Sequence, residues 1–270
     1  MNILFFGTPD ICIPYLEALQ NSTHTLVGIV CNRDSYVGRK HILTEPPTKK
    51  WGNEHSIEVF QPERLRSFTE TSTLVKADLH IVIAYGKILP QDLISLPKFG
   101  TINIHYSLLP RWRGASPVEA AILAGDSEIG VCIQQMCFEL DSGPIIAEQH
   151  IPLYGNEYAS ELKHSMSILG AELLMSTMES IENRTIMSVE QDASKATFCK
   201  KISKSEGEIY HNDTDISKYN KWRAYHPWPG IFYFDNTGIR IKITDADWNE
   251  KRFRIKKIVR AGESEITLVM

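Results

Sequence analysis

Three polar side chains near the middle of the chain could together act on a carbonyl group. Asn103 and His105 lie two residues apart in Thr101–His105, a run whose β-branched residues indicate a buried strand. Side chains two apart on a strand share a face, so we expect both near the strand's C-terminal end. Asp141 follows the apolar run Gly130–Met136 in a polar turn. Together, the three can stabilise a developing oxyanion and handle one proton.

Each of these residues also has an ordinary structural interpretation. Asn103 could satisfy loop backbone, His105 could be a core histidine bonded to a carbonyl, and Asp141 could be a turn former before Ser142-Gly143. Taken singly, each is better explained in that way. Their occurrence together favours the functional interpretation.

The surrounding sequence settles the choice. The run Asn-Ile-His-Tyr-Ser-Leu-Leu-Pro-Arg-Trp-Arg-Gly-Ala-Ser-Pro from Asn103, with Leu-Asp-Ser-Gly from Leu140, resembles the 10-formyltetrahydrofolate-dependent formyltransferases. The resemblance implies formyl transfer through a tetrahedral intermediate, with Asn103, His105 and Asp141 as catalytic residues. It also implies a folate pocket, for which the candidate residues are Ile88, Leu89, Pro90, Ser107, Leu108, Leu109, Pro110 and Leu140.

The elements that must position these residues follow a β-α-β pattern, which predicts a parallel sheet with right-handed crossovers. Thr8 is placed to cap the first helix, with Pro9 at its first position. Helices are expected at 117–124, with Ser116 as cap, and at 158–181. The expected strands are 3–6, 26–30, 57–60, 79–84, 101–105, 130–136 and 144–149, then 231–234, 239–244, 253–258 and 266–269.

The resemblance implies an α/β fold in which a Rossmann-like, mostly parallel sheet precedes a small β-rich, OB-like or truncated-barrel region. We expect a catalytic domain over 1–185, a linker over 186–205 and the small domain over 206–270. Only a single glycine, Gly7, occupies the first turn, so a dinucleotide-binding interpretation is weak. The polar segment 183–197 reads as part of the linker that crosses back over the sheet.

Composition limits the alternatives. The 270 residues carry a net charge of −4, which does not indicate nucleic-acid binding. Residues 201–270, however, hold 13 Lys and Arg against 10 Asp and Glu. The five cysteines form no CxxC pair and the histidines no HxxxH spacing, so no metal is expected. With no signal peptide and no membrane-length apolar run, we expect a cytoplasmic monomer.

The long connection from Asn32 to Pro62 contains Gly38-Arg39-Lys40. Charge alone favours a solvated surface loop. In the methionyl-tRNA formyltransferases, which the chain resembles here and at Trp228-Pro229-Gly230, this segment is a basic loop that enters the acceptor end of the tRNA. The resemblance therefore implies that Arg39 and Lys40 contact methionyl initiator tRNA. The basic run Lys251–Arg260 could be a second tRNA surface or an edge strand guarded by lysines.

Two other functions stay open on the sequence. The same donor and catalytic residues could formylate a nucleotide-linked amino sugar, since such enzymes often have a small C-terminal domain. A catalytically silent folate- or RNA-binding module is the third interpretation. The presence of all three catalytic residue types argues against it.

Overall fold

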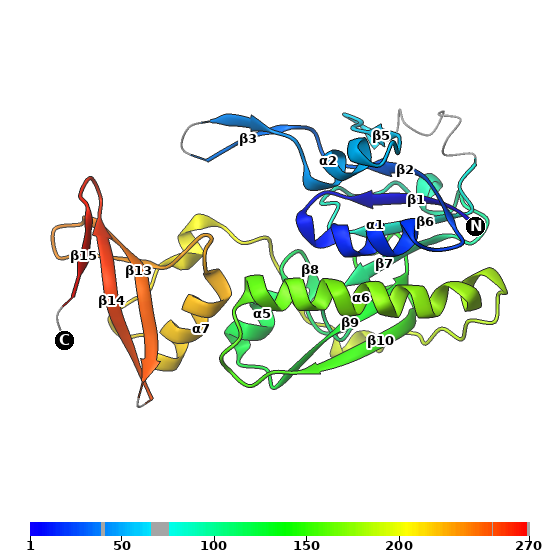
Figure 1. Cartoon of the computed structure of the whole chain (residues 1–270). Helices are drawn as coiled ribbons and strands as arrows, with labels where there is room; N and C mark the ends of the chain where they lie inside the picture. The colour runs from blue at the N-terminus through cyan, green and yellow to red at the C-terminus, as the bar shows by residue number, and fades with distance from the viewer. Residues whose placement is uncertain (39–40, 66–75, 250, 269–270) are drawn as a thin grey trace. The chain divides into compact units, whose positions relative to one another are not determined.

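The computed structural model describes the chain except for residues 39–40, 66–75, 250 and 269–270 (Figure 1). The chain divides into two compact units. The first comprises Met1–Arg113, Gly130–His150 and His164–Thr197, and the second comprises Gly114–Ile129, Ile151–Lys163 and Phe198–Met270.

A seven-stranded sheet in the order β10-β9-β7-β6-β1-β2-β5 forms the first unit. The neighbours from β7 to β5 pair in parallel, whereas β9 runs antiparallel to β7. Near-continuous apolar runs form the parallel strands because helices and loops cover both faces of such a sheet. The strands are β1 (Asn2–Gly7), β2 (Thr25–Val30), β5 (Val59–Phe60), β6 (Leu79–Ile83), β7 (Thr101–His105), β9 (Glu128–Gln135) and β10 (Ile145–Pro152).

All seven expected strands of this sheet are confirmed, with shifted ends. The expected strand at 57–60 shortens to β5 because the Ile57 amide donates to Gly52 O at 2.9 Å. That bond closes the turn after α2 (Pro47–Glu54) and leaves only Val59 and Phe60 to pair with β2.

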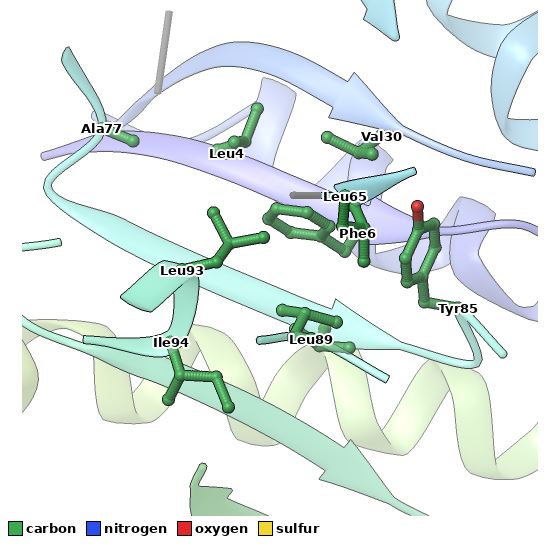
Figure 2. Packing of buried hydrophobic residues seen from close by; sticks show 10 residues of the cluster. Leu4, Phe6, Val30, Leu65, Ala77, Tyr85, Leu89, Leu93 and Ile94 are labelled. Carbon is green, nitrogen blue, oxygen red and sulfur yellow. The ribbon is translucent and has the colours of Figure 1, made fainter. Parts of the chain in front are cut away.

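One hydrophobic cluster of this unit lies where β1, β2 and β6 pack against the segment that follows β6. Figure 2 shows Phe6 among side chains from these elements, including Leu89 and Tyr85. The other helices of the unit are η1 (Asp10–Cys12), α1 (Ile13–Gln20), α4 (Gln91–Ile94), η3 (Ala193–Lys195) and most of α6 (Ala159–Glu182). No helix in the described part of the chain is long and apolar enough to cross a membrane.

The predicted cap of the first helix is wrong. Pro9 precedes the 3-10 turn η1, and α1 begins only at Ile13. Thr8 instead accepts a hydrogen bond from Asn32 N at 3.2 Å through its hydroxyl. Its side chain therefore ties the end of β1 to the end of β2 and is not available to cap a helix.

The connection after β2 forms a two-stranded hairpin where the sequence suggested a loop. β3 (Ser35–Val37) pairs antiparallel with β4 (Ile42–Thr44), and all six residues are exposed. The β-branched and aromatic residues of these strands suit an extended ribbon. Arg39 and Lys40 lie outside the described residues.

The second unit contains a four-stranded antiparallel sheet in the order β12-β13-β14-β15, with α7 packed on β13 and β14 (Figure 1). Its strands are confirmed as β12 (Phe232–Phe234), β13 (Arg240–Asn249), β14 (Arg252–Arg260) and β15 (Glu265–Thr267). Its helices are α5 (Pro117–Ala124), η4 (Lys204–Gly207) and α7 (Asp215–Tyr225), and the short strands β8 (Arg113–Gly114) and β11 (Phe198–Cys199) complete the chain.

Two helix starts in this unit differ from expectation. Ser116 occupies the N-cap position of α5, but its side chain makes no capping hydrogen bond. The helix α7 was not expected at all. Thr214 caps it by accepting from Ser217 N at 3.3 Å, and Asp215 adds a negative charge in the first turn.

His80 gives this fold a dependence on pH. It is fully buried in β6 against Phe6, and burial lowers its pKa from 6.5 to about 4. Because the unfolded chain binds this proton first, the free energy of unfolding falls as the pH drops from 6.5 towards 4. We expect a contribution of up to about 3 kcal/mol.

The substitution His80→Leu removes the titrating group. Urea unfolding across that pH interval is expected to give a shallower loss of stability for the variant than for the wild type. Equal slopes for the two proteins would show that His80 titrates alike in the folded and unfolded states.

Candidate active site

The structure brings Asn103, His105 and Asp141 together. The Asn103 amide donates to Asp141 Oδ1 at 3.4 Å, and His105 Nδ1 lies 3.8 Å from Asp141 Oδ2. Asn103 and His105 share a face of β7, as the period of a strand requires. His105 is buried and Asp141 nearly so. The gathering of the three side chains is therefore confirmed, and their catalytic roles stay a prediction.

Asp141 approaches from an unexpected direction. In the antiparallel pairing of β7 and β9, Ile102 lies opposite Gln135 and His105 lies opposite Cys132. The turn after β9 therefore starts beside the first residues of β7, not beside its C-terminal end. The turn must fold back over the sheet for Asp141 to reach Asn103 and His105.

His105 is also held by the loop that follows β7. Its Nε2 lies 2.9 Å from Trp112 O, and a carbonyl oxygen can only accept. This bond therefore places the hydrogen of a neutral ring on Nε2. The lone pair of Nδ1 then faces Asp141, where it can accept a proton.

The turn that carries Asp141 depends on a glycine and on a left-handed residue. Asp141 has a φ of 47°, a conformation that aspartate tolerates better than most residues. A side chain at Gly143 would collide with the carbonyl oxygen of Gln135. The sequence Asp-Ser-Gly therefore suits this turn for reasons of backbone geometry as well as chemistry.

Three residues to which the sequence assigned no role hold Asp141, two of them directly and one through Gln191. Gln134 on β9 donates to Asp141 Oδ1 at 3.2 Å. Gln191 donates to the backbone oxygens of Asp141 and Gly143 at 2.9 and 2.7 Å. Arg113 donates to Gln191 Oε1 through Nε and Nη2 at 3.1 and 2.8 Å.

Sequence reasoning missed these residues for different reasons. Gln191 belongs to the polar segment 183–197 that looked like a linker, and it reaches the site because Val189 pairs with Ile145 on β10. Arg113 stands inside the recognised motif, where its position was the available signal. Gln134 was missed because only the register of β7 and β9, which the sequence does not show, places it directly opposite Asn103.

The candidate folate residues after β7 mainly hold the loop in place. Ser107 is fully buried, and its hydroxyl donates to Arg111 O at 2.6 Å. Leu109 is buried, with its amide 3.4 Å from Cys132 Sγ. Leu108 packs where Gly130 has no side chain. Leu108 and Pro110 are partly exposed.

The candidate folate residues after β6 divide between a hollow and the core. Ile88 and Pro90 line a hollow of about 750 Å³, together with Lys87 and Phe138. Ile88 is 83% exposed. Leu89 points the other way and is buried in the core cluster (Figure 2). Leu140 is 58% exposed on the turn that carries Asp141.

The described residues offer no metal site, and the basic run of β14 is partly paired with carboxylates. Among the described residues, no group of three or more His, Cys, Asp or Glu side chains is arranged to hold a metal ion. In the basic run of β14, Lys256 pairs with Asp247, Lys257 with Glu265 and Arg260 with Asp235. These pairs neutralise part of the charge that suggested a polyanion surface.

Comparison with known proteins adds a family and relatives. A model described as formyl transferase matches residues 1–178. The methionyl-tRNA formyltransferase of Sulfurihydrogenibium sp. is 37% identical over 270 residues, which cover 98% of this chain and 86% of that protein.

Solved structures share the fold at low identity. The methionyl-tRNA formyltransferase from Clostridium thermocellum aligns with a TM-score of 0.67 and 14% identity, covering 96% of this chain and 98% of that one. A sugar 3N-formyltransferase, WlaRD, crystallised with dTDP and 5-N-formyl-THF, aligns with a TM-score of 0.67 and 16% identity, covering 98% and 99% of the two chains. At these identities the likeness concerns the fold alone.

Gly143 offers a test of the turn. In Gly143→Ala the new methyl group meets the Gln135 carbonyl oxygen, which cannot rotate away as a side chain could. We expect the free energy of unfolding to fall by about 1–3 kcal/mol in urea titrations. Gln149→Ala, an exposed change on β10, should shift it by less than about 0.5 kcal/mol. Equal stabilities for Gly143→Ala and the wild type would contradict the close approach.

Proposed function

This chain belongs to the formyl transferase family, and we propose that it transfers a formyl group from 10-formyltetrahydrofolate to the amino group of methionyl initiator tRNA. The observation that carries the proposal is the meeting of Asn103, His105 and Asp141 within the part of the chain that the family model matches. The name of the 37% identical relative supports the acceptor.

In the proposed reaction, the neutral amine of the acceptor forms a C–N bond to the formyl carbon, and the bond from that carbon to the folate nitrogen breaks. The donor supplies an activated one-carbon unit, so no covalent enzyme intermediate is needed. The amine loses one proton and the leaving folate nitrogen gains one. The protein must therefore stabilise negative charge on the formyl oxygen and move a proton.

The residues present suit these tasks. An amide group carries two hydrogens, so Asn103 can donate one to Asp141 and the other to the developing oxyanion. His105 Nδ1 faces the carboxylate of Asp141, and a proton taken from the amine would lie between these two groups. Because free α-amino groups titrate near ~7.7–8.0, a base is needed only as the new bond forms.

The hollow beside Ile88 and Pro90 suits a folate. Its volume of about 750 Å³ falls in the range of sites for small molecules. The exposed side chains of Ile88, Phe138 and Leu140 offer apolar surface for a pterin and its aromatic extension. Leu89, being in the core, would contribute only through its backbone.

The tRNA would be contacted at the hairpin of β3 and β4. Arg39 and Lys40 lie between these strands in the sequence, and arginine and lysine side chains can bind the phosphates of a nucleic acid. We also propose that the chain works as a monomer in the cytoplasm. Its five cysteines are free, which suits a reducing compartment.

The acceptor can be tested directly. Purified protein is incubated with 10-formyltetrahydrofolate and either methionyl initiator tRNA or a nucleotide-linked amino sugar, and formylated product is measured by mass spectrometry. We expect formyl-methionine on the tRNA and no formylated sugar. Formylation of the sugar alone would overturn the proposed acceptor, and formylation of neither would overturn the proposed function.

Asp141→Asn tests the proton step. The amide keeps the size of the side chain but cannot hold the proton, so we expect kcat to fall by about 10²–10⁴-fold. Binding of 5-formyltetrahydrofolate, followed by calorimetry, should change little. Asp215→Asn, in the first turn of α7, is the matched control and should keep wild-type kcat. A wild-type rate in Asp141→Asn would exclude the assigned role.

A further inference from the structure

We propose that Gln191 is a positioning residue for Asp141 and that Arg113 holds Gln191 in the orientation this role requires. The inference rests on the proposed function and names residues that act through Asp141 without touching the substrates. It is carried by the hydrogen bonds that join these side chains inside the first unit.

The chemistry of Arg113 fixes which way the Gln191 amide points. A guanidinium donates hydrogen bonds and never accepts them, so the atom of Gln191 that faces it must be the oxygen. Arg113 makes that contact with two of its nitrogens, at 3.1 and 2.8 Å, and is only 3% exposed. The NH2 group of Gln191 is therefore aimed away from Arg113.

The NH2 group of Gln191 clamps the turn on both sides of Ser142. It donates to Asp141 O at 2.9 Å and to Gly143 O at 2.7 Å, and it also lies 3.4 Å from Gln134 Oε1. That last contact turns the NH2 group of Gln134 towards Asp141 Oδ1, 3.2 Å away. Gln191 thus acts on both the backbone and the carboxylate of Asp141.

Asp141 needs such a clamp because its backbone is not in a broadly favoured conformation. A φ of 47° is less favourable for a non-glycine residue than the ordinary regions, even though aspartate tolerates it better than most. The two hydrogen bonds that Gln191 donates to the turn offset this cost. Without them, the turn can relax and carry the carboxylate away from Asn103 and His105.

Gln191→Glu isolates this role. A glutamate keeps an oxygen for Arg113 and even strengthens that contact by charge. It loses the NH2 group and sets an oxygen against the carbonyls of Asp141 and Gly143. We expect kcat to fall by about 10–100-fold, with KM for donor and acceptor little changed, because the reacting groups are misplaced while binding surfaces persist. Gln149→Glu, the same change at an exposed position of β10, should leave kcat unchanged.

A double-mutant cycle separates positioning from general support of the fold. If Gln191 acts through Asp141, adding Gln191→Glu to Asp141→Asn should lower kcat no further. An unaltered kcat in Gln191→Glu, or losses that multiply in the double variant, would overturn the proposal. Should Gln191→Glu fail to fold, Arg113→Lys serves instead. Lysine cannot make the two-nitrogen contact, and a smaller fall in kcat with the same non-additivity is expected.

A crystal structure of Gln191→Glu tests the inference without any assay. We expect the φ of Asp141 to leave the left-handed region and its carboxylate to move away from His105. An unchanged turn would overturn the positioning role even if the kcat of the variant is reduced. If the wild type formylates neither acceptor, the proposed function fails, and this structural result still decides the role of Gln191.

Discussion

The arrangement of the site depends on where one turn places the carboxylate of Asp141. Asp141 lies on a turn whose flanking strands, β9 and β10, continue the sheet beyond β7. The turn begins beside the first residues of β7, whereas His105 lies at the C-terminal end of that strand. Folding the turn back costs backbone freedom and puts Asp141 in the left-handed region. Gly143 removes the steric obstacle, and hydrogen bonds from Gln191 supply the restraint. The contacts of Asn103 and His105 with Asp141 therefore depend on this turn.

Local patterns were sufficient for much of the fold. Thr101–His105 and Pro117–Ala124 form the strand and the helix that their patterns predict, with the same bounds, because apolar periodicity and a leading proline act within a few residues. The helix α7 escaped notice because its aromatic and polar residues show no clear apolar stripe, although Thr214 and Asp215 are ordinary signals of a helix start. The composition of β9 did not show that this strand pairs antiparallel with β7.

Contacts between distant segments explain what the sequence could not supply. Gln191 stands 50 residues after Asp141 in a polar stretch, and only the pairing of Val189 with Ile145 brings it to the site. In the same way, the sequence left open whether the basic run of β14 was a tRNA surface or an edge strand. In the structure β14 pairs on both sides, and Lys256 has a cross-strand partner in Asp247. A charge run in a sequence shows neither its register nor its counter-ions, and polar segments show no partner until the chain is folded.

The two carboxylate oxygens of Asp141 have different surroundings, and the difference determines which of them can share a proton with His105. Oδ1 accepts from the amides of Asn103 and Gln134 at 3.4 and 3.2 Å. Oδ2 is left facing His105 Nδ1 at 3.8 Å. In a neutral ring, whose one hydrogen the bond to Trp112 O places on Nε2, Nδ1 and Oδ2 are both acceptors and cannot bond to each other. A proton arriving between them turns this contact into a charge-assisted hydrogen bond. The amides on Oδ1 orient the carboxylate with Oδ2 towards His105, so the place for that proton is set by the protein's own side chains.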